Sequence, residues 1–251
     1  MEITKNCRRY AILQSEPVYW ETRKTCDYTS SQVSKLMGIS PFCSRRKYWL
    51  KTITEKIPLV AAQHGIHYVH SPYNEHRSRM MMHGQTLEPT AIELYKKKIL
   101  HKTEALSPPA FYVKEITRGD TTLTIGCTPD SEIVRPFCKG PLEIKCPWSR
   151  IYENMPEYYI PQVAIQMDVM GSDWAHFFVM YGDRWKLWGM TANDDDSIDY
   201  IYDMIFDFHE KYMVVGKGGL KGPNRMPRGL KAKINEELLK RYTIVPICES
   251  E

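Results

Sequence analysis

The sequence lacks the features that would assign it to several large classes of protein. No apolar stretch approaches the roughly 18 residues that a membrane-spanning helix requires. Residues 1–20 carry several charges and no apolar run of the kind found in secretory signals. The seven cysteines are scattered and include no Cys-x-x-Cys pair, which argues against a disulfide framework and a structural zinc site. These absences predict a soluble, intracellular protein with no membrane partner.

A strong net charge is also missing. The 34 basic and 30 acidic residues leave a formal charge of +4, so the chain is not a polycation that coats nucleic acid. Any nucleic-acid surface must therefore be a local patch. Hydrophobic residues make up 43% of the 251 positions, which is ample material for a core. The length predicts a single domain over 1–251, with its core at about 20–215.

The most informative part of the chain is a short strand that carries Glu143 and Lys145 after a Pro129-Asp130 turn. Side chains two positions apart in a strand point to the same face, so Glu143 and Lys145 share one side. The other side of this strand is apolar, which predicts that the strand is half-buried. Asp130 would add a second carboxylate, and hard oxygen ligands beside an amine suit Mg²⁺ or Mn²⁺ and phosphodiester cleavage. The alternative is an outward-facing, salt-bridged pair on a charged strand.

Two helices supply further candidates. Glu88 lies in a helix predicted over 84–99, where an exposed glutamate is also routine. Gln162 lies in a helix predicted over 156–171, and Gln166 falls on the same face one turn later. A polar surface stripe is the alternative for both glutamines. Strands are predicted within 107–134, 141–146, 175–181 and 185–190, a long amphipathic helix over 197–215, and irregular structure over 58–76.

Several residues are candidates for contact with phosphates. Ser30 and Ser31 start a predicted helix, where they could cap it or bind a phosphate. Arg45 belongs to a predicted helix with a basic and aromatic face. The basic, Gly-rich segment 216–233 is either a flexible loop or an arm that contacts phosphates through residues such as Arg225 and Arg228. A C-terminal helix, 234–251, is predicted to follow.

Taken together and in order, these segments resemble the lambda exonuclease family, also called YqaJ-like viral recombinases, within the PD-(D/E)XK nucleases. The resemblance covers about residues 20–182. The matching pieces are Trp20 with Lys24, Thr29-Ser30-Ser31-Gln32-Val33, Gly84-x-x-x-Glu88, Thr128-Pro129-Asp130, Glu143-Ile144-Lys145-Cys146-Pro147 and Tyr159-x-x-Gln162.

The resemblance implies an α/β fold with a restriction-endonuclease-like core, a mixed central β-sheet flanked by helices. It implies that Asp130, Glu143 and the backbone carbonyl of Ile144 bind the metal, and that Glu88 completes the acidic shell. It further implies that Lys145 orients and helps to deprotonate the attacking water, and that Gln162 holds this water or the scissile phosphate.

The resemblance also implies that Ser31, with Ser30, and Lys24 bind a substrate phosphate. The family often has arginine near the position of Lys24, and here the neighbouring residue is Arg23.

The function implied is a Mg²⁺-dependent deoxyribonuclease, in which Mn²⁺ can substitute, that works on double-stranded DNA ends in the 5′→3′ direction. Its expected context is viral or phage-type recombination and genome processing, in the host nucleus or cytoplasm if the protein is viral. A single-strand annealing protein as partner and a homotrimer, the ring that lambda exonuclease forms, are expected from the same resemblance. The alternatives are an endonuclease or RNase on the same core, as in viral alkaline nucleases, or a catalytically dead nucleic-acid-binding protein.

Overall fold

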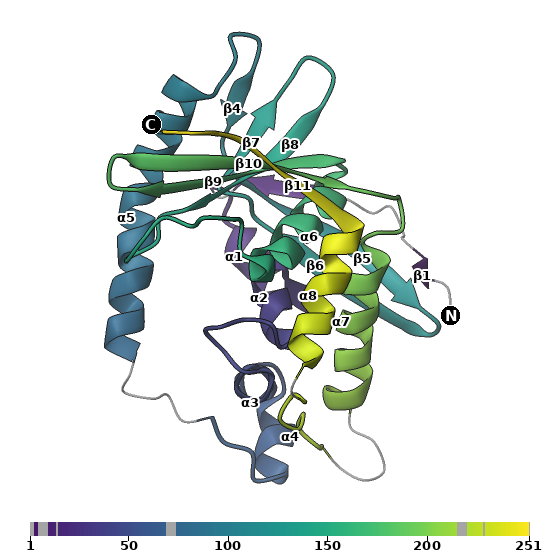
Figure 1. Cartoon of the computed structure of the whole chain (residues 1–251). Helices are drawn as coiled ribbons and strands as arrows, with labels where there is room; N and C mark the ends of the chain where they lie inside the picture. Colours follow the sequence, from purple (N-terminus) through teal and green to yellow (C-terminus); the bar gives the residue numbers. More distant parts are fainter. Residues whose placement is uncertain are drawn as a thin grey trace.

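The computed structural model describes residues 3–4, 10–13, 15–68, 74–214, 220–227 and 229–250. Its strands form two mixed sheets, with helices packed between and around them (Figure 1). The α/β class and the restriction-endonuclease-like core agree with the sequence-based expectation, although the strands are divided between two sheets instead of forming a single central one. Within the described residues, no helix is both long and apolar enough to cross a membrane.

The first sheet is built around the hairpin of β5 and β6, which turns at Gly119 with a φ of 59°. A positive φ at this position favours glycine, because it has no Cβ. Strand β3 pairs in parallel with β6, so that Thr29 lies opposite Gly126. The strands of this sheet are β1 (Ile3–Thr4), β2 (Tyr10–Leu13), β3 (Tyr28–Thr29), β5 (Ala110–Arg118) and β6 (Thr121–Cys127).

The second sheet has the order β11-β10-β9-β8-β7-β4, and only its β8–β9 pair is parallel among the described strands. A parallel pair needs a crossover connection, which here contains helix α6. The strands are β4 (Ala105–Ser107), β7 (Ser131–Val134), β8 (Lys139–Lys145), β9 (Trp174–Tyr181), β10 (Arg184–Ala192) and β11 (Tyr242–Glu249).

Helix α6 lies between the two sheets, in contact with β5 and β6 on one side and with β8 and β9 on the other. Nine of its eleven residues are buried, which explains why the segment is apolar around most of its circumference. The helices are α1 (Tyr19–Thr25), α2 (Ser30–Leu36), α3 (Arg45–Lys56), α4 (Pro58–Gln63), α5 (Asn74–Lys98), η1 (Glu157–Tyr159), α6 (Ile160–Met170), α7 (Asp199–Tyr212) and α8 (Leu230–Arg241).

Two element predictions are wrong. Residues 58–63 form helix α4 with Pro58 in its first turn, a position that proline favours, and α5 begins at Asn74 instead of Gly84. The C-terminal helix predicted for 234–251 ends at Arg241, and Tyr242–Glu249 form the edge strand β11. Its β-branched residues favour a strand, and Pro246 is tolerated because β11 lies at the edge of the sheet.

Within the basic segment 216–233, the described residues 220–227 pack onto the body of the protein, and α8 begins at Leu230. A Cβ at Gly222 would lie 2.4 Å from the Trp49 ring, and a Cβ at Gly38 would lie 2.2 Å from the methyl carbon of Met226. Gly222 therefore permits a close approach to the Trp49 ring that a larger residue would block, while Gly38 is favoured by its φ of 80°. The stretch has no helix or strand, and its contact with phosphates stays a prediction. Arg225 is exposed on it, and Arg228 lies outside the described residues.

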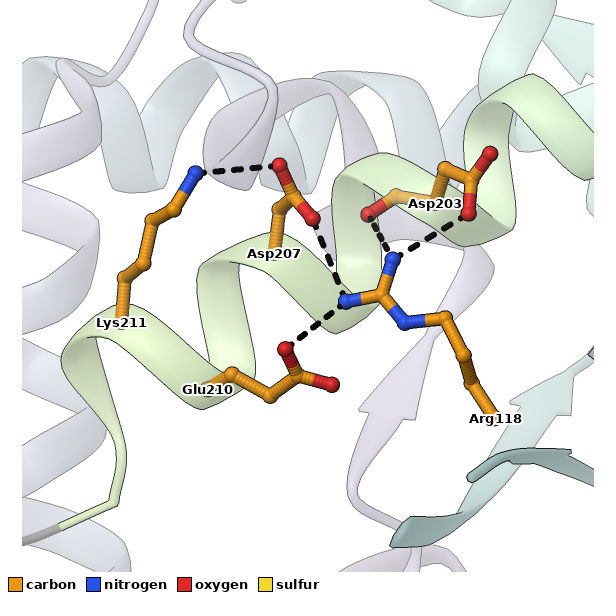
Figure 2. Close-up of polar contacts among 5 residues, drawn as sticks. All are labelled: Arg118, Asp203, Asp207, Glu210 and Lys211. Carbon is orange, nitrogen blue, oxygen red and sulfur yellow. Dashed lines mark hydrogen bonds and ion pairs between the residues drawn. The ribbon is translucent and has the colours of Figure 1, made fainter. Parts of the chain in front are cut away.

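A cluster of charged side chains joins the β5–β6 hairpin to helix α7 (Figure 2). The Arg118 guanidinium contacts Asp203 and Asp207 at 3.1 Å and Glu210 at 3.0 Å, while Lys211 contacts only Asp207. Burial alone would raise the pKa of Asp207, but Lys211 and Arg118 together lower it below the usual value. Arg118 is 12% exposed, so its bonds are less screened by water than those of Lys211, which is 62% exposed.

We expect Arg118→Met to lower the free energy of unfolding by about 1–2 kcal/mol, because three carboxylates then lose their shared cation. The pKa of Asp207 is depressed in the folded state, so its contribution is present above the usual aspartate pKa of about 3.9 and is lost as the pH falls below it. Urea unfolding at pH 7 and at about pH 3, which lies below the usual aspartate pKa, should show this difference shrink. Lys211→Met is the matched control, with a change below about 0.5 kcal/mol. Equal effects of both variants would contradict this account.

Candidate active site

The structure brings Asp130, Glu143 and Lys145 together at the end of β8. Asp130 lies in the link between β6 and β7, where its backbone N–H donates to the Leu142 carbonyl at 3.1 Å. Its Oδ2 accepts a hydrogen bond from the Ile144 N–H at 2.6 Å. The backbone of β8 therefore fixes both the main chain and the side chain of Asp130. Glu143 and Lys145 project from the same strand and contact each other, as their spacing predicts.

The Glu143 carboxylate is only 1% exposed and is surrounded by donors. Oε1 accepts from Lys145 Nζ and from Gln162 Nε2, the latter at 2.5 Å. Oε2 accepts from Gln166 Nε2 at 2.6 Å. A buried carboxylate is stable only when such partners replace water. The alternative of an outward-facing salt bridge is thus wrong, and so is a polar surface stripe for Gln166, which is completely buried.

Four of these residues form one wall of a cleft of about 440 Å³, namely Asp130, Glu143, Lys145 and Gln162. Gln85 and Glu88, from the middle of α5, lie on the same cleft, and Glu88 is half-buried. The Lys145 ammonium lies 5.4 Å from the centre of the Tyr159 ring, within the range of a cation–π contact. Every residue to which the sequence assigned a catalytic role therefore lines this one cleft.

A second wall of the cleft carries hydroxyl groups and the Arg23 guanidinium. Arg23 donates to Thr128 Oγ1 at 3.2 Å and to the Tyr19 hydroxyl at 3.0 Å. Ser30 and Ser31 also line the cleft, whereas a capping box of Thr29 and Gln32 caps helix α2. The cap role considered for the two serines therefore falls to Thr29.

Of the two neighbouring cations on α1, Arg23 lines the cleft and Lys24 does not. Lys24 is exposed and is absent from the cleft lining. On a helix, neighbouring residues point about 100° apart, so a shift of one position moves a side chain from the cleft to solvent. The spacing of Tyr19 and Arg23, four residues apart on α1, is the signal that places both on the cleft side.

Two other predicted DNA contacts, Arg45 and Arg225, do not line this cleft. The Arg45 guanidinium packs over the rings of Phe208 and Tyr212, at 5.4 Å and 5.2 Å, with its Nε buried. This packing favours a structural role for Arg45. Arg225 is exposed on the 220–227 segment and does not line the cleft.

Most of the chain matches a known protein family. Residues 19–173, more than half of the chain, match the family model of the YqaJ-like viral recombinase domain. The chain belongs to this family. No curated protein sequence matches it significantly.

Among solved structures, the fold is similar to LHK-Exo, an alkaline exonuclease from Laribacter hongkongensis. In its complex with dAMP, LHK-Exo is 20% identical to this chain over 90% of this chain and 97% of its own, with a TM-score of 0.51. Another structure of the same protein is also 20% identical, over 76% and 90% of the two chains, with a TM-score of 0.49.

The charges of this YqaJ-like site are unbalanced. Burial raises the pKa of Asp130 well above its usual value, and the nearby Glu143 and Glu88 raise it further against the opposing effect of Lys145. Burial also raises the pKa of Glu88. For Lys145, burial alone would lower the pKa, but Glu143 and Asp130 outweigh it and raise the pKa above the usual lysine value. One ammonium thus serves three carboxyl groups, and a cation would relieve the remaining repulsion.

The donors in the cleft fit a divalent cation in charge and chemistry, because carboxylate oxygens are what Mg²⁺ and Mn²⁺ prefer. In the part of the chain that the structure describes, no three carboxylate, imidazole or thiol groups are gathered into a ready-made metal cluster. Both oxygens of Glu143 are instead occupied by Lys145 and the two glutamines.

We expect Asp130→Asn to stabilise the protein in EDTA at pH 8 by on the order of 1 kcal/mol, or roughly 2–4 °C in Tm. The raised pKa of Asp130 means that native stability falls as the pH rises from about 3.9 through the folded-state value. Asparagine removes that penalty and still accepts the Ile144 hydrogen bond. Thermal melts should show the advantage shrink toward pH 4.

Asp120→Asn, at the exposed β5–β6 turn, is the control and should leave the Tm unchanged. Added Mg²⁺ should raise the Tm of the wild type more than that of Asp130→Asn. A lower Tm of Asp130→Asn in EDTA would show that the charge repulsion at this site is unimportant.

Proposed function

We propose that this protein is a divalent-cation-dependent deoxyribonuclease that degrades double-stranded DNA from its ends. The observation that carries the proposal is the pairing of two walls in one cleft. The carboxylates and ammonium of Asp130, Glu143 and Lys145 line the same cleft as Arg23 and Ser31. The first wall suits phosphodiester hydrolysis, and the second suits binding of a phosphate. Membership of the YqaJ-like family supports a nuclease of the lambda exonuclease type.

Asp130, Glu143 and the Ile144 carbonyl would hold the cation, with Glu88 completing the acidic shell. Mg²⁺ is the proposed ion, and Mn²⁺ would substitute. When bound, the cation neutralises phosphate charge and makes water easier to deprotonate.

The side chains of this protein would then orient the reactants. Lys145 is held between Glu143 and the Tyr159 ring, so that its remaining N–H groups can donate to the attacking water or to a phosphate oxygen. Gln162 is only half-buried and lines the cleft, which places its amide within reach of the same water or phosphate. Such positioned donors stabilise the negative charge that develops on phosphate during in-line attack.

The direction of degradation would be 5′→3′. Arg23 is fixed by Tyr19 and Thr128, and a fork of N–H donors on a fixed arginine suits the several oxygens of a terminal phosphate. A 5′-phosphate held there would place the adjacent phosphodiester toward the Asp130–Glu143 wall. A role in viral or phage-type recombination, an annealing protein as partner and a homotrimer remain proposals from the family resemblance.

We expect linear duplex DNA to disappear in Mg²⁺ but not in EDTA, while covalently closed circular duplex stays intact. A linear substrate labelled at one 5′ or one 3′ end shows which label is released first. Lys145→Ala should lower the rate by at least about 10²-fold, because it removes a positioned donor at the reacting phosphate. Cutting of the circle would favour an endonuclease, and retained DNA binding without any cutting would favour RNA as the substrate or a dead site.

Arg23→Ala should slow degradation of 5′-phosphorylated duplex by about 10-fold or more, because a charged hydrogen bond to phosphate is lost. Its rate on duplex with a 5′-hydroxyl should change much less. Lys24→Ala is the matched control, since it removes an equal charge from the next residue outside the cleft. Equal losses for the two variants on both substrates would leave the 5′-phosphate assignment without support.

A further inference from the structure

The second oxygen of the Glu143 carboxylate is engaged by a residue that does not line the cleft. Gln166 lies one helical turn after Gln162 on α6 and donates its amide N–H to Glu143 Oε2 at 2.6 Å. An ionised carboxylate can only accept hydrogen bonds, so the amide must present its NH₂ group here. The two glutamines therefore hold one oxygen each and fix the plane of the carboxylate between them.

The burial of Gln166 is hard to explain by packing alone. The side chain is 0% exposed, and its Oε1 has no hydrogen-bond partner within the described part of the chain. Burying an unpaired carbonyl oxygen is unfavourable, and a methionine or leucine would fill the same space without that cost. Such a polar group in an apolar helix is expected where its one hydrogen bond matters for function.

The helix that carries Gln166 is itself anchored close by. Two residues later, Asp168 accepts from Lys114 Nζ of β5 at 2.5 Å and also from the Tyr202 hydroxyl of α7. Lys114 is 1% exposed, so this ion pair is shielded from water. The anchor prevents α6 from sliding or rotating between the two sheets. The position of the Gln166 amide relative to β8 is thereby fixed by contacts on both sides of the helix.

We propose that Gln166 is a positioning residue that orients the Glu143 carboxylate for binding of the divalent cation. The proposal rests on the proposed function for the role of Glu143. Gln166 touches no part of the cleft, so it acts only through Glu143, whereas Gln162 also faces the substrate side. Groups that hold a metal ligand in place typically contribute 10–100-fold to metal affinity or activity.

The test is titration of full-length, metal-free protein with Mn²⁺ in the absence of DNA, by calorimetry. We expect Gln166→Met, which keeps the volume and removes the amide, to weaken Mn²⁺ binding by about 10-fold. In a Glu143→Gln background, Gln166→Met should cause no further loss, because the ligand that it positions has gone. On DNA, Gln166→Met should lower kcat and leave KM unchanged.

Asn235→Leu is the matched control, since Asn235 on α8 also has a buried side-chain oxygen without a partner among the described residues. It should not change Mn²⁺ affinity. Unchanged Mn²⁺ binding in Gln166→Met, or an equal loss in the Glu143→Gln background, would overturn the proposal.

A Gln166→Met protein that fails to fold would be replaced by Gln166→Asn, whose shorter amide cannot reach Oε2. Loss of folding in both variants would assign Gln166 to the core and also overturn the proposal. Wild-type protein that binds Mn²⁺ in a Gln166-dependent way but cuts no DNA would sink the proposed function alone. Absence of Mn²⁺ binding to the wild type would overturn both.

Discussion

The burial of the Glu143 carboxylate is the constraint on which the site depends. A charge that is removed from water must be surrounded by donors, and a single strand cannot supply them. Strand β8 pairs in parallel with β9, so the chain between them must cross over the sheet, and α6 is part of that crossover. The connection that the sheet topology requires is thus the element that brings Gln162 and Gln166 to Glu143.

The same burial leaves the site with an excess of negative charge. Burial is the main reason that the pKa of Asp130 is raised, and Glu143 and Glu88 raise it further while Lys145 opposes them. Proteins accept such local instability where a ligand relieves it, because selection acts on function once overall stability suffices. The Arg118 cluster in Figure 2 is the reverse case. Its three carboxylates share one arginine, so their charges are offset by the protein itself.

The sequence predicts most of the carboxylate wall of the cleft because its residues follow local rules. Alternation places Glu143 and Lys145 on one face, and helical spacing places Gln162 and Gln166 on another. Which of Arg23 and Lys24 lines the cleft depends on the rotation of the seven-residue helix α1. The hydrogen bond between the Tyr19 and Thr128 hydroxyls fixes that rotation. The β-branched residues of β11 favour a strand. Its place at the edge of the sheet depends on pairing with β10, about fifty residues earlier, and no local pattern reveals that partner.

The two walls of the cleft are joined by a very short piece of chain. Strand β6 belongs to the first sheet and β7 to the second, and residues 128–130 are the link between them. Thr128 contacts Arg23, while Asp130 is bonded to β8, so this link touches both walls within three residues. The backbone of this link therefore sets how far Arg23 lies from the Asp130 carboxylate. Pro129 restricts the conformations of that backbone further. A rigid spacing of this kind would suit an enzyme that measures one step from a DNA end, because the bound terminus then defines which phosphodiester is cut.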